Sequence, residues 1–91
     1  MTIAKRFIVK GRVQGVGYRY FAINAAANCG IVGTVRNLPD GTVEAVAEGT
    51  PAAVADFRDQ LQHGPSYARV TSVHEAEIKA TGRYKDFDVT Y

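Results

Sequence analysis

The chain has 91 residues, a length typical of one small domain, and we expect residues 1–91 to fold as a single unit. Hydrophobic residues make up 46% of the chain and charged residues 22%, which is the composition of a globular protein and excludes a disordered one. The 11 basic and 9 acidic residues leave a net charge of +2, and the basic residues are scattered along the chain. Because nucleic acids are bound by clustered Lys and Arg, the composition predicts no nucleic-acid partner.

The sequence also bears on the cellular location. No segment is long enough to span a membrane, and the N-terminal residues MTIAKRFIVKG are typical of a strand rather than of a signal peptide. Cys29 is the only cysteine and cannot form a disulfide within the chain, which suits a reducing compartment. We therefore expect a cytoplasmic protein with no membrane partner.

The first half of the chain contains two expected strands and a helix between them. Residues 3–10 alternate between apolar and polar, as in a half-buried strand. A glycine-rich loop, residues 11–17, follows it. From Tyr18 the apolar residues recur every three or four positions, which predicts a helix that ends at Gly30. The β-branched run 31–37 then predicts a second strand.

The second half adds three strands and one helix. The segment NLPDG, residues 37–41, predicts the turn of a β-hairpin. Thr50 followed by Pro51 is a helix start, because the threonine oxygen can cap the end and proline loses no needed hydrogen bond at the first position. This helix ends before Gly64. The expected strands are residues 42–48, 70–79 and 87–91.

The resulting order, β-α-β-β-α-β with a short extra C-terminal strand, predicts an α+β protein. Two right-handed crossovers around a hairpin give a ferredoxin-like sandwich, in which an antiparallel sheet carries both helices on one face. This fold hosts enzymes, RNA-binding modules and sensors of small ligands, so it does not decide the function.

The run GRVQGVGYR, residues 11–19, is the strongest chemical signal in the sequence. A loop with few side chains exposes backbone N–H groups that can surround an anion, and the helix start behind it adds a partial positive charge. Arg19 lies in the first helical turn, where the positive end of the helix dipole disfavours a cation. Its place there is favourable if an anion is bound between Arg19 and the glycine-rich loop. The run is neither a phosphate-binding Walker loop nor a complete dinucleotide fingerprint, since Tyr20 replaces the third glycine. A tight bend without a ligand is the alternative interpretation.

The same run resembles the signature of the acylphosphatases, enzymes that hydrolyse the carboxyl–phosphate bond of acyl phosphates. A second family motif, GTVRNLPDGTVE, follows at the expected separation, and the resemblance extends over almost the whole chain. Two positions depart from the family pattern, because Tyr18 replaces phenylalanine and Thr34 replaces an aromatic residue that is expected in the pocket wall or core. The matching residues are Gly11, Val13, Gln14, Gly15, Val16 and Arg19 in the first motif and Gly33, Asn37, Gly41 and Val43 in the second.

The resemblance implies different roles for two side chains of the site. It implies that Arg19 binds the phosphoryl oxygens, which suits its planar and permanently charged guanidinium. It also implies that Asn37 holds the attacking water. Since neither motif contains a base, we infer that a phosphate oxygen of the substrate takes the proton of that water. The backbone amides expected to bind the phosphate are those of Gln14, Gly15, Val16, Gly17 and Tyr18.

We expect no metal and no cofactor. His63 and His74 are far apart in the sequence and have no ligand partners at a usable spacing, so both are expected on the surface. The expected partners are an acyl phosphate as the substrate and inorganic phosphate as the product and inhibitor. We expect the protein to act as a monomer.

Three alternatives stay open from the sequence. The loop could hold an anion in a binding module that does no chemistry. The chain could be an RNA-recognition-type domain, although the first strand has no outward aromatic residue and the third has none at all. Asn37 could simply initiate the turn that follows it.

Overall fold

The computed structural model describes all residues, 1–91, and contains five strands and two helices in the expected order. The element boundaries lie within two residues of those expected from the sequence. The elements are β1 (Ile3–Arg12), α1 (Tyr18–Cys29), β2 (Val32–Asn37), β3 (Val43–Gly49), α2 (Pro51–His63), β4 (Arg69–Ile78) and β5 (Phe87–Val89).

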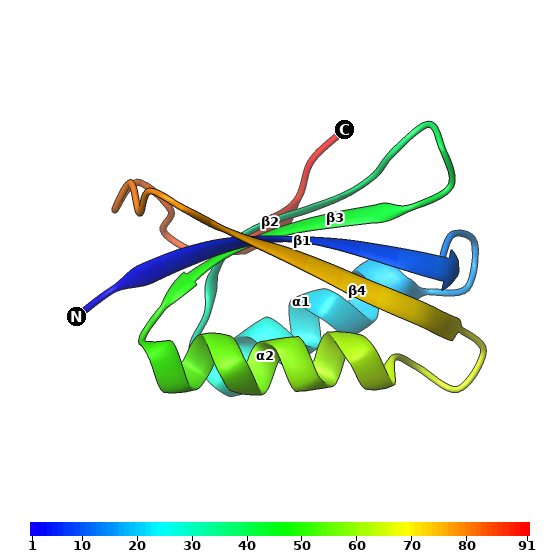
Figure 1. Cartoon of the computed structure of the whole chain (residues 1–91), viewed down its shortest axis with the longest axis horizontal. Coiled ribbons are helices and arrows are strands. Elements are labelled where there is room, and N and C mark those ends of the chain that lie inside the picture. Colours follow the sequence, from blue (N-terminus) through cyan, green and yellow to red (C-terminus); the bar gives the residue numbers. More distant parts are fainter.

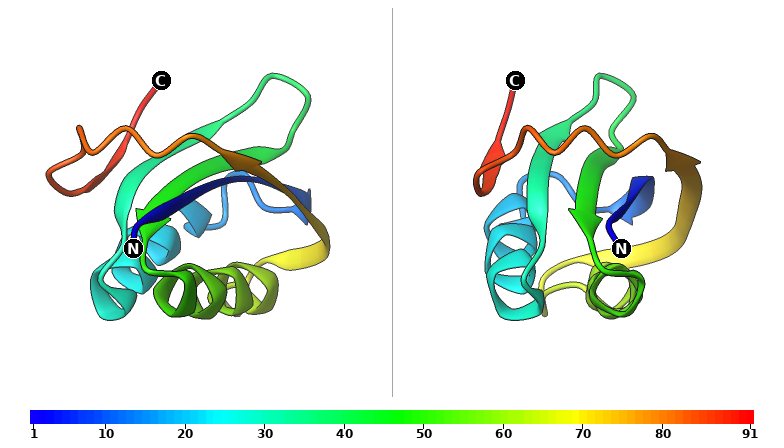
Figure 2. Two further views of the ribbon diagram at one scale, coloured as in Figure 1. Left: turned by 60° about the vertical axis from the view of Figure 1, so that its left-hand side comes forward. Right: turned by 90° about the vertical axis from the view of Figure 1, so that its left-hand side faces the viewer.

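The strands form one sheet in the order β4-β1-β3-β2-β5, and both helices cover the same face (Figures 1 and 2). The four longer strands pair antiparallel, as expected. The short β5 pairs parallel with β2, so the complete sheet is mixed rather than purely antiparallel. The ferredoxin-like α+β fold predicted from the sequence is thereby confirmed.

The helix ends have the caps expected from the sequence. Gly30 ends α1 in the left-handed conformation, with φ 71°, and its N–H donates to Ala26 O. At the start of α2 the Thr50 side chain accepts a hydrogen bond of 3.1 Å from Ala53 N, and Pro51 occupies the first turn.

The core lies between the helices and the sheet and contains 16 buried residues. Phe57 of α2 stands at its centre, with edge-on contacts to Phe7 of β1 at 6.2 Å and to Phe87 of β5 at 5.4 Å between ring centroids. The core therefore holds the last strand, β5, in place against both the sheet and α2.

Two glycines allow strands to approach each other closely. A Cβ on Gly33 would lie 1.8 Å from Val46 O, and one on Gly11 would lie 2.0 Å from Arg69 O. Both glycines also have φ values, 149° and 126°, that other residues rarely adopt. Gly11 lies at the irregularity in the β1–β4 register, where the chain leaves the sheet for the loop that leads into α1.

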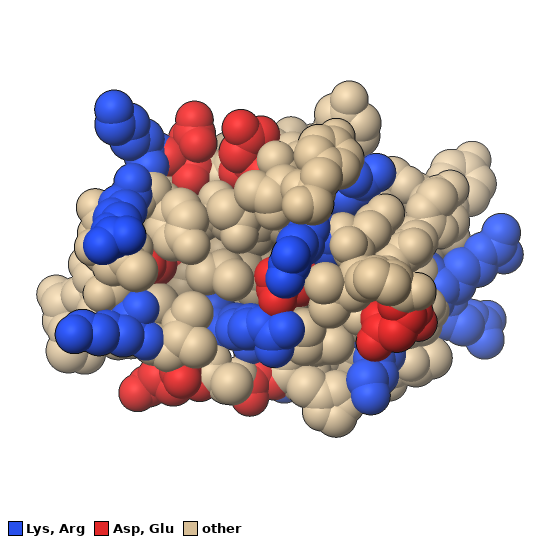
Figure 3. All heavy atoms as spheres, turned by 90° about the horizontal axis from the view of Figure 1, so that it is seen from above, with Lys and Arg blue, Asp and Glu red and all other residues tan.

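The face of the sheet away from the helices carries charges of both signs (Figure 3). Glu44 on β3 accepts hydrogen bonds from Arg6 Nε at 2.7 Å and from Arg36 Nε at 2.9 Å. Burial alone would raise the pKa of Glu44, but the two arginines outweigh it and hold the pKa below its ordinary value of 4.5.

Glu48, also on β3, fixes the segment that crosses this face. Its carboxylate accepts hydrogen bonds from Thr81 N, Thr81 Oγ1 and Gly82 N at 2.9–3.1 Å. These bonds hold residues 79–86 over the sheet on their way from β4 to β5 (Figure 2).

We expect Glu44→Gln to reduce the free energy of unfolding at pH 7 by up to about 1 kcal/mol, since the two arginines are partly solvent-exposed. The folded pKa of Glu44 lies below the unfolded one, so its contribution is present above pH 4.5 and is lost as the pH falls through the folded value. Urea unfolding at pH 7 and pH 3 measures both effects. An equal loss of stability at the two pH values would contradict this origin.

Candidate active site

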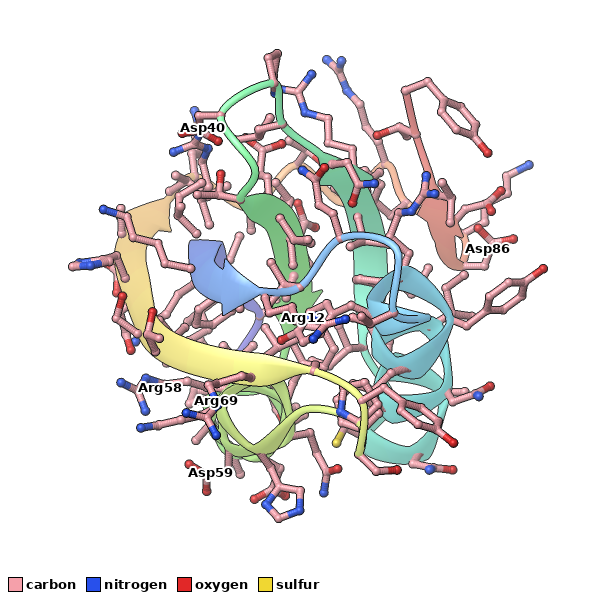
Figure 4. The ribbon with its side chains drawn as sticks, turned by 90° about the vertical axis from the view of Figure 1, so that its right-hand side faces the viewer. Arg12, Asp40, Arg58, Asp59, Arg69 and Asp86 are labelled. Carbon is pink, nitrogen blue, oxygen red and sulfur yellow. The ribbon has the colours of Figure 1, made fainter.

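A cleft of about 540 Å³ opens at one end of the molecule. The loop between β1 and α1 arcs across this end, the β2–β3 hairpin lies above it, and β5 lies beyond β2 (Figure 4). The cleft is therefore built from segments that are far apart in the sequence. Its lining residues are Val13, Gly15, Gly17, Tyr18, Arg19, Tyr20, Ile23, Asn37, Asp88, Val89 and Tyr91.

The loop owes its curl to Gly15 and Gly17, whose φ values are 73° and 77°. Gly17 is also the N-cap residue of α1, and no side chain caps this helix end. The first turn contains no acidic residue. The N–H groups and the positive dipole end of α1 are thus left for an anionic ligand.

Arg19 is half-buried in this first turn and lines the cleft. None of the four ion pairs in the structure involves Arg19. Its guanidinium carbon lies 5.7 Å from the centroid of the Tyr91 ring, in cation–π geometry. The charge of Arg19 is therefore not neutralised by a carboxylate of the protein.

Asn37 is the last residue of β2 and is half-buried at the cleft. Its Oδ1 atom is buried and accepts no hydrogen bond from the protein. The turn that follows is made by Asp40 instead, whose Oδ1 accepts from Thr42 N at 3.0 Å and from Thr42 Oγ1 at 2.6 Å. These hydrogen bonds, with a smaller contribution from Lys10, outweigh the effect of burial and hold the pKa of Asp40 below its usual value. Initiating the turn is therefore not the role of the Asn37 side chain.

The Gln14 side chain joins the loop to the hairpin. Its Nε2 donates to Leu38 O and to Thr42 O, both at 2.8 Å. Leu38 directly follows Asn37, so these bonds fix the loop relative to the strand end that carries Asn37. Only the backbone amide of Gln14 was expected in the site, although the position of this glutamine in the GRVQGVGYR run was a signal for a wider role.

The predicted site residues fall into two groups. Five of them line the cleft, namely Gly15, Gly17, Tyr18, Arg19 and Asn37. Gln14 and Val16 belong to the same loop but are not in the lining; Val16 packs against the core. The Tyr18 hydroxyl points away into the interior and donates to Leu61 O at 2.6 Å, and burial raises the pKa of this phenol.

The outer wall of the cleft was not predicted from the sequence. Tyr20 and Ile23 come from α1, and Asp88, Val89 and Tyr91 from β5 and the residues after it. Thr34, which was expected in the pocket wall or core, is in neither. It pairs with Asp88 and Val46, and it alternates with the buried Val35, so it lies on the sheet face away from the helices.

His63 and His74 are both exposed, on α2 and β4. No group of three or more His, Cys, Asp or Glu side chains is placed to hold a metal ion. The cleft contributes one cation, one carboxylate, backbone amides and a carboxamide, which together can bind an anion and orient a water molecule.

The chain is similar to known proteins over its whole length. The acylphosphatase family model matches residues 5–89. A protein from Methanothrix thermoacetophila named acylphosphatase is 45% identical over 91 residues, which cover both chains completely. One of the same name from Mannheimia succiniciproducens is 43% identical over 98% of this chain and 99% of its own. The crystal structure of acylphosphatase from Bacillus subtilis superimposes with a TM-score of 0.93 at 36% identity, covering 98% of this chain and 99% of the other.

We expect Gln14→Ala to loosen the loop, because both of its hydrogen bonds to the hairpin are lost. The free energy of unfolding should fall by about 1–2 kcal/mol, and the backbone amides of the loop should exchange with solvent faster. Leu38 O and Thr42 O each keep one backbone hydrogen bond, from Gly41 N and Leu38 N, so the fold should persist.

Amide hydrogen exchange, with urea unfolding beside it, measures this prediction. Gln62→Ala, which changes an exposed glutamine of α2, is the matched control. Unchanged exchange of the loop amides in Gln14→Ala would show that Gln14 does not join the loop to the hairpin.

Proposed function

Since the chain belongs to the acylphosphatase family and is a hydrolase of acyl phosphates, we propose that Arg19 binds the phosphoryl group and Asn37 positions the attacking water. The products of this reaction are a carboxylate and inorganic phosphate. Family membership favours the enzyme over a binding module without chemistry. The observation that supports the residue roles is that the buried Asn37 Oδ1 has no protein partner, in a residue that lines the same cleft as Arg19, which forms no ion pair.

The phosphoryl group lies, in this proposal, between Arg19 and the curled loop. The guanidinium offers paired N–H donors that fit two phosphoryl oxygens at once. Backbone N–H groups bind the remaining oxygens and stabilise the charge of the transition state without having to reorganise. The amides assigned to this role are those of Gln14, Gly15, Val16, Gly17 and Tyr18.

Asn37 orients the nucleophile in the same proposal. A water molecule can donate to the free Oδ1 while the Asn37 amide group donates to the phosphoryl group. A carboxamide cannot take a proton at neutral pH, so its contribution is the placement of the water at attacking distance from phosphorus.

The bond changes require no base from the protein. The water oxygen forms a bond to phosphorus, and the bond between phosphorus and the acyl oxygen breaks with its electron pair going to the carboxylate. The proton of the water passes to a phosphoryl oxygen of the substrate. The carboxylate leaves without a proton because the pKa of a carboxylic acid is roughly 4. Asp88 lines the cleft, but its Oδ1 accepts from Val89 N, and we assign it no proton transfer.

We also propose that residues 1–91 act as one domain and as a monomer in a reducing compartment. The single core of 16 residues, drawn from both helices and four of the strands, supports one folding unit. No helix of the structure is long and apolar enough to cross a membrane.

Neither β1 nor β3 presents an aromatic residue on the sheet face away from the helices, which disfavours stacking of RNA bases there.

Arg19→Ala and Asn37→Ala should each lower kcat/KM for benzoyl phosphate by about a hundredfold or more while leaving the protein folded. Arg19→Lys should recover little, because an ammonium group lacks the paired donors. Initial rates, with circular dichroism as the check on folding, test this prediction. The controls are Arg12→Ala and Asn24→Ala, which remove an exposed arginine and an exposed asparagine outside the cleft. Full activity of Arg19→Ala or Asn37→Ala would refute the role assigned to that residue.

Inorganic phosphate should inhibit competitively, and the two variants should respond differently. Arg19→Ala should weaken phosphate binding by about tenfold or more, because a charged hydrogen bond to the anion is lost. Asn37→Ala should weaken phosphate binding by no more than about threefold, because Asn37 offers the anion one neutral donor whereas Arg19 offers paired, charged donors. Isothermal titration with phosphate measures both affinities without turnover, and the opposite pattern would reverse the two roles.

A further inference from the structure

The cleft is larger than the reaction centre needs. At about 540 Å³ it lies within the range of roughly 300–1,000 Å³ that is usual for sites of small organic ligands. A phosphoryl group held by the loop and Arg19 would fill only the inner part. The outer part is lined by Tyr20, Ile23, Val89 and Tyr91, which no step of the proposed hydrolysis uses.

This outer wall exposes apolar surface that the protein does not bury. The Tyr20 and Tyr91 side chains are 78% and 98% exposed, and both are among the five exposed large hydrophobic residues of the chain. Both line the cleft, Tyr20 next to Arg19 on α1 and Tyr91 in the residues after β5. Exposed aromatic rings that line a cleft are typical of ligand binding.

The position of the Tyr91 ring relates this wall to the reaction. Its centroid lies 5.7 Å from the Arg19 guanidinium carbon. The acyl group is attached directly to the phosphoryl group that Arg19 is proposed to bind, so the Tyr91 ring lies within reach of the acyl group.

The outer wall of the cleft carries a negative charge, that of Asp88. Apart from Arg19, which is engaged by the phosphoryl group, Asp88 has the one charged side chain in the lining. Asp88 is exposed and belongs to none of the ion pairs in the structure. A carboxylate at this place repels an acyl group that carries a negative charge of its own.

We infer that the outer wall is an acyl-group subsite that selects uncharged aromatic or aliphatic acyl phosphates over small or anionic ones. The selection rests on the proposed binding of the phosphoryl group at Arg19. Tyr20 and Tyr91 contact the apolar acyl group, and Asp88 disfavours acyl groups that end in a carboxylate.

The first test compares benzoyl phosphate with acetyl phosphate. The ratio of their kcat/KM values should fall about tenfold in the double variant Tyr20→Ala, Tyr91→Ala, because contact between aromatic rings is lost. The two substrates differ in intrinsic reactivity, but this difference is the same for the variant and the unchanged protein. It therefore cancels when the ratios of the two proteins are compared. Tyr67→Ala, which removes a tyrosine that is 82% exposed but outside the cleft, should keep the ratio of the unchanged protein.

The second test compares succinyl phosphate with butyryl phosphate, which have the same carbon chain length but differ in charge. Asp88→Asn should raise the succinyl-to-butyryl ratio by up to about fivefold at low salt, the size expected for two solvent-exposed unit charges. The difference should shrink at high ionic strength. Asp86→Asn, a change to an exposed aspartate outside the cleft lining, is the control.

The outcomes separate the subsite from the catalytic proposal. If both ratios stay unchanged while Arg19→Ala is inactive on all four substrates, the acyl subsite is refuted and the role of Arg19 stands. If Arg19→Ala remains active, the catalytic proposal fails whatever the ratios are. A fall of the benzoyl-to-acetyl ratio in Tyr67→Ala as well would also overturn the subsite.

Discussion

The left-handed backbone of Gly15 and Gly17 is the constraint on which the site depends. Nothing lies within 4 Å of a Cβ placed on either glycine, so the space would admit a side chain. The φ values are 73° and 77°, and a residue other than glycine would adopt either of them only at a cost of roughly 1 kcal/mol or more. Because the chain curls here, α1 begins without a side-chain cap, and its first turn can carry the positive charge of Arg19 facing an open cleft.

The sheet order brings the other half of the site to the same place. β1 and β2 both pair antiparallel with β3, so they run in the same direction and their C-terminal ends lie at the same end of the sheet. β5 is parallel to β2 and ends there as well. The loop after β1, Asn37 at the end of β2 and Tyr91 after β5 therefore meet without any of them being close in sequence. The Gln14 amide then holds the first two together.

Much of this could be predicted from the sequence, because the signals are local. Periodicity placed the strands and helices, and the caps at Gly30 and Thr50 marked helix ends that the structure confirms. The loop and Asn37 were found through motifs whose residues lie close together in the chain. Gly15, Gly17, Arg19 and Asn37 line one cleft, and their roles in the reaction stay predictions.

The outer wall could not be predicted in this way. It depends on the parallel pairing of the three-residue β5 with β2, a long-range contact that leaves no periodic pattern in the sequence. The role of the Gln14 side chain depends on the distance to two backbone carbonyls, which no local pattern reports. The place of Thr34 was wrong because it was carried over from the aromatic residue of the family pattern, whereas alternation with the buried Val35 puts Thr34 on the other face of the sheet.

The hydrogen bond of the Tyr18 hydroxyl limits which segments can be exchanged between related proteins in a chimaera. The family pattern that the first motif resembles has phenylalanine here. In this chain the Tyr18 phenol donates to the Leu61 carbonyl near the end of α2, a helix that contributes nothing to the cleft lining. The carbonyls of a last helical turn lack partners within their own helix. A chimaera that combines the N-terminal half of a phenylalanine-bearing relative with α2 of this chain would leave Leu61 O buried without this donor. Residue 18 and α2 should thus be transferred together.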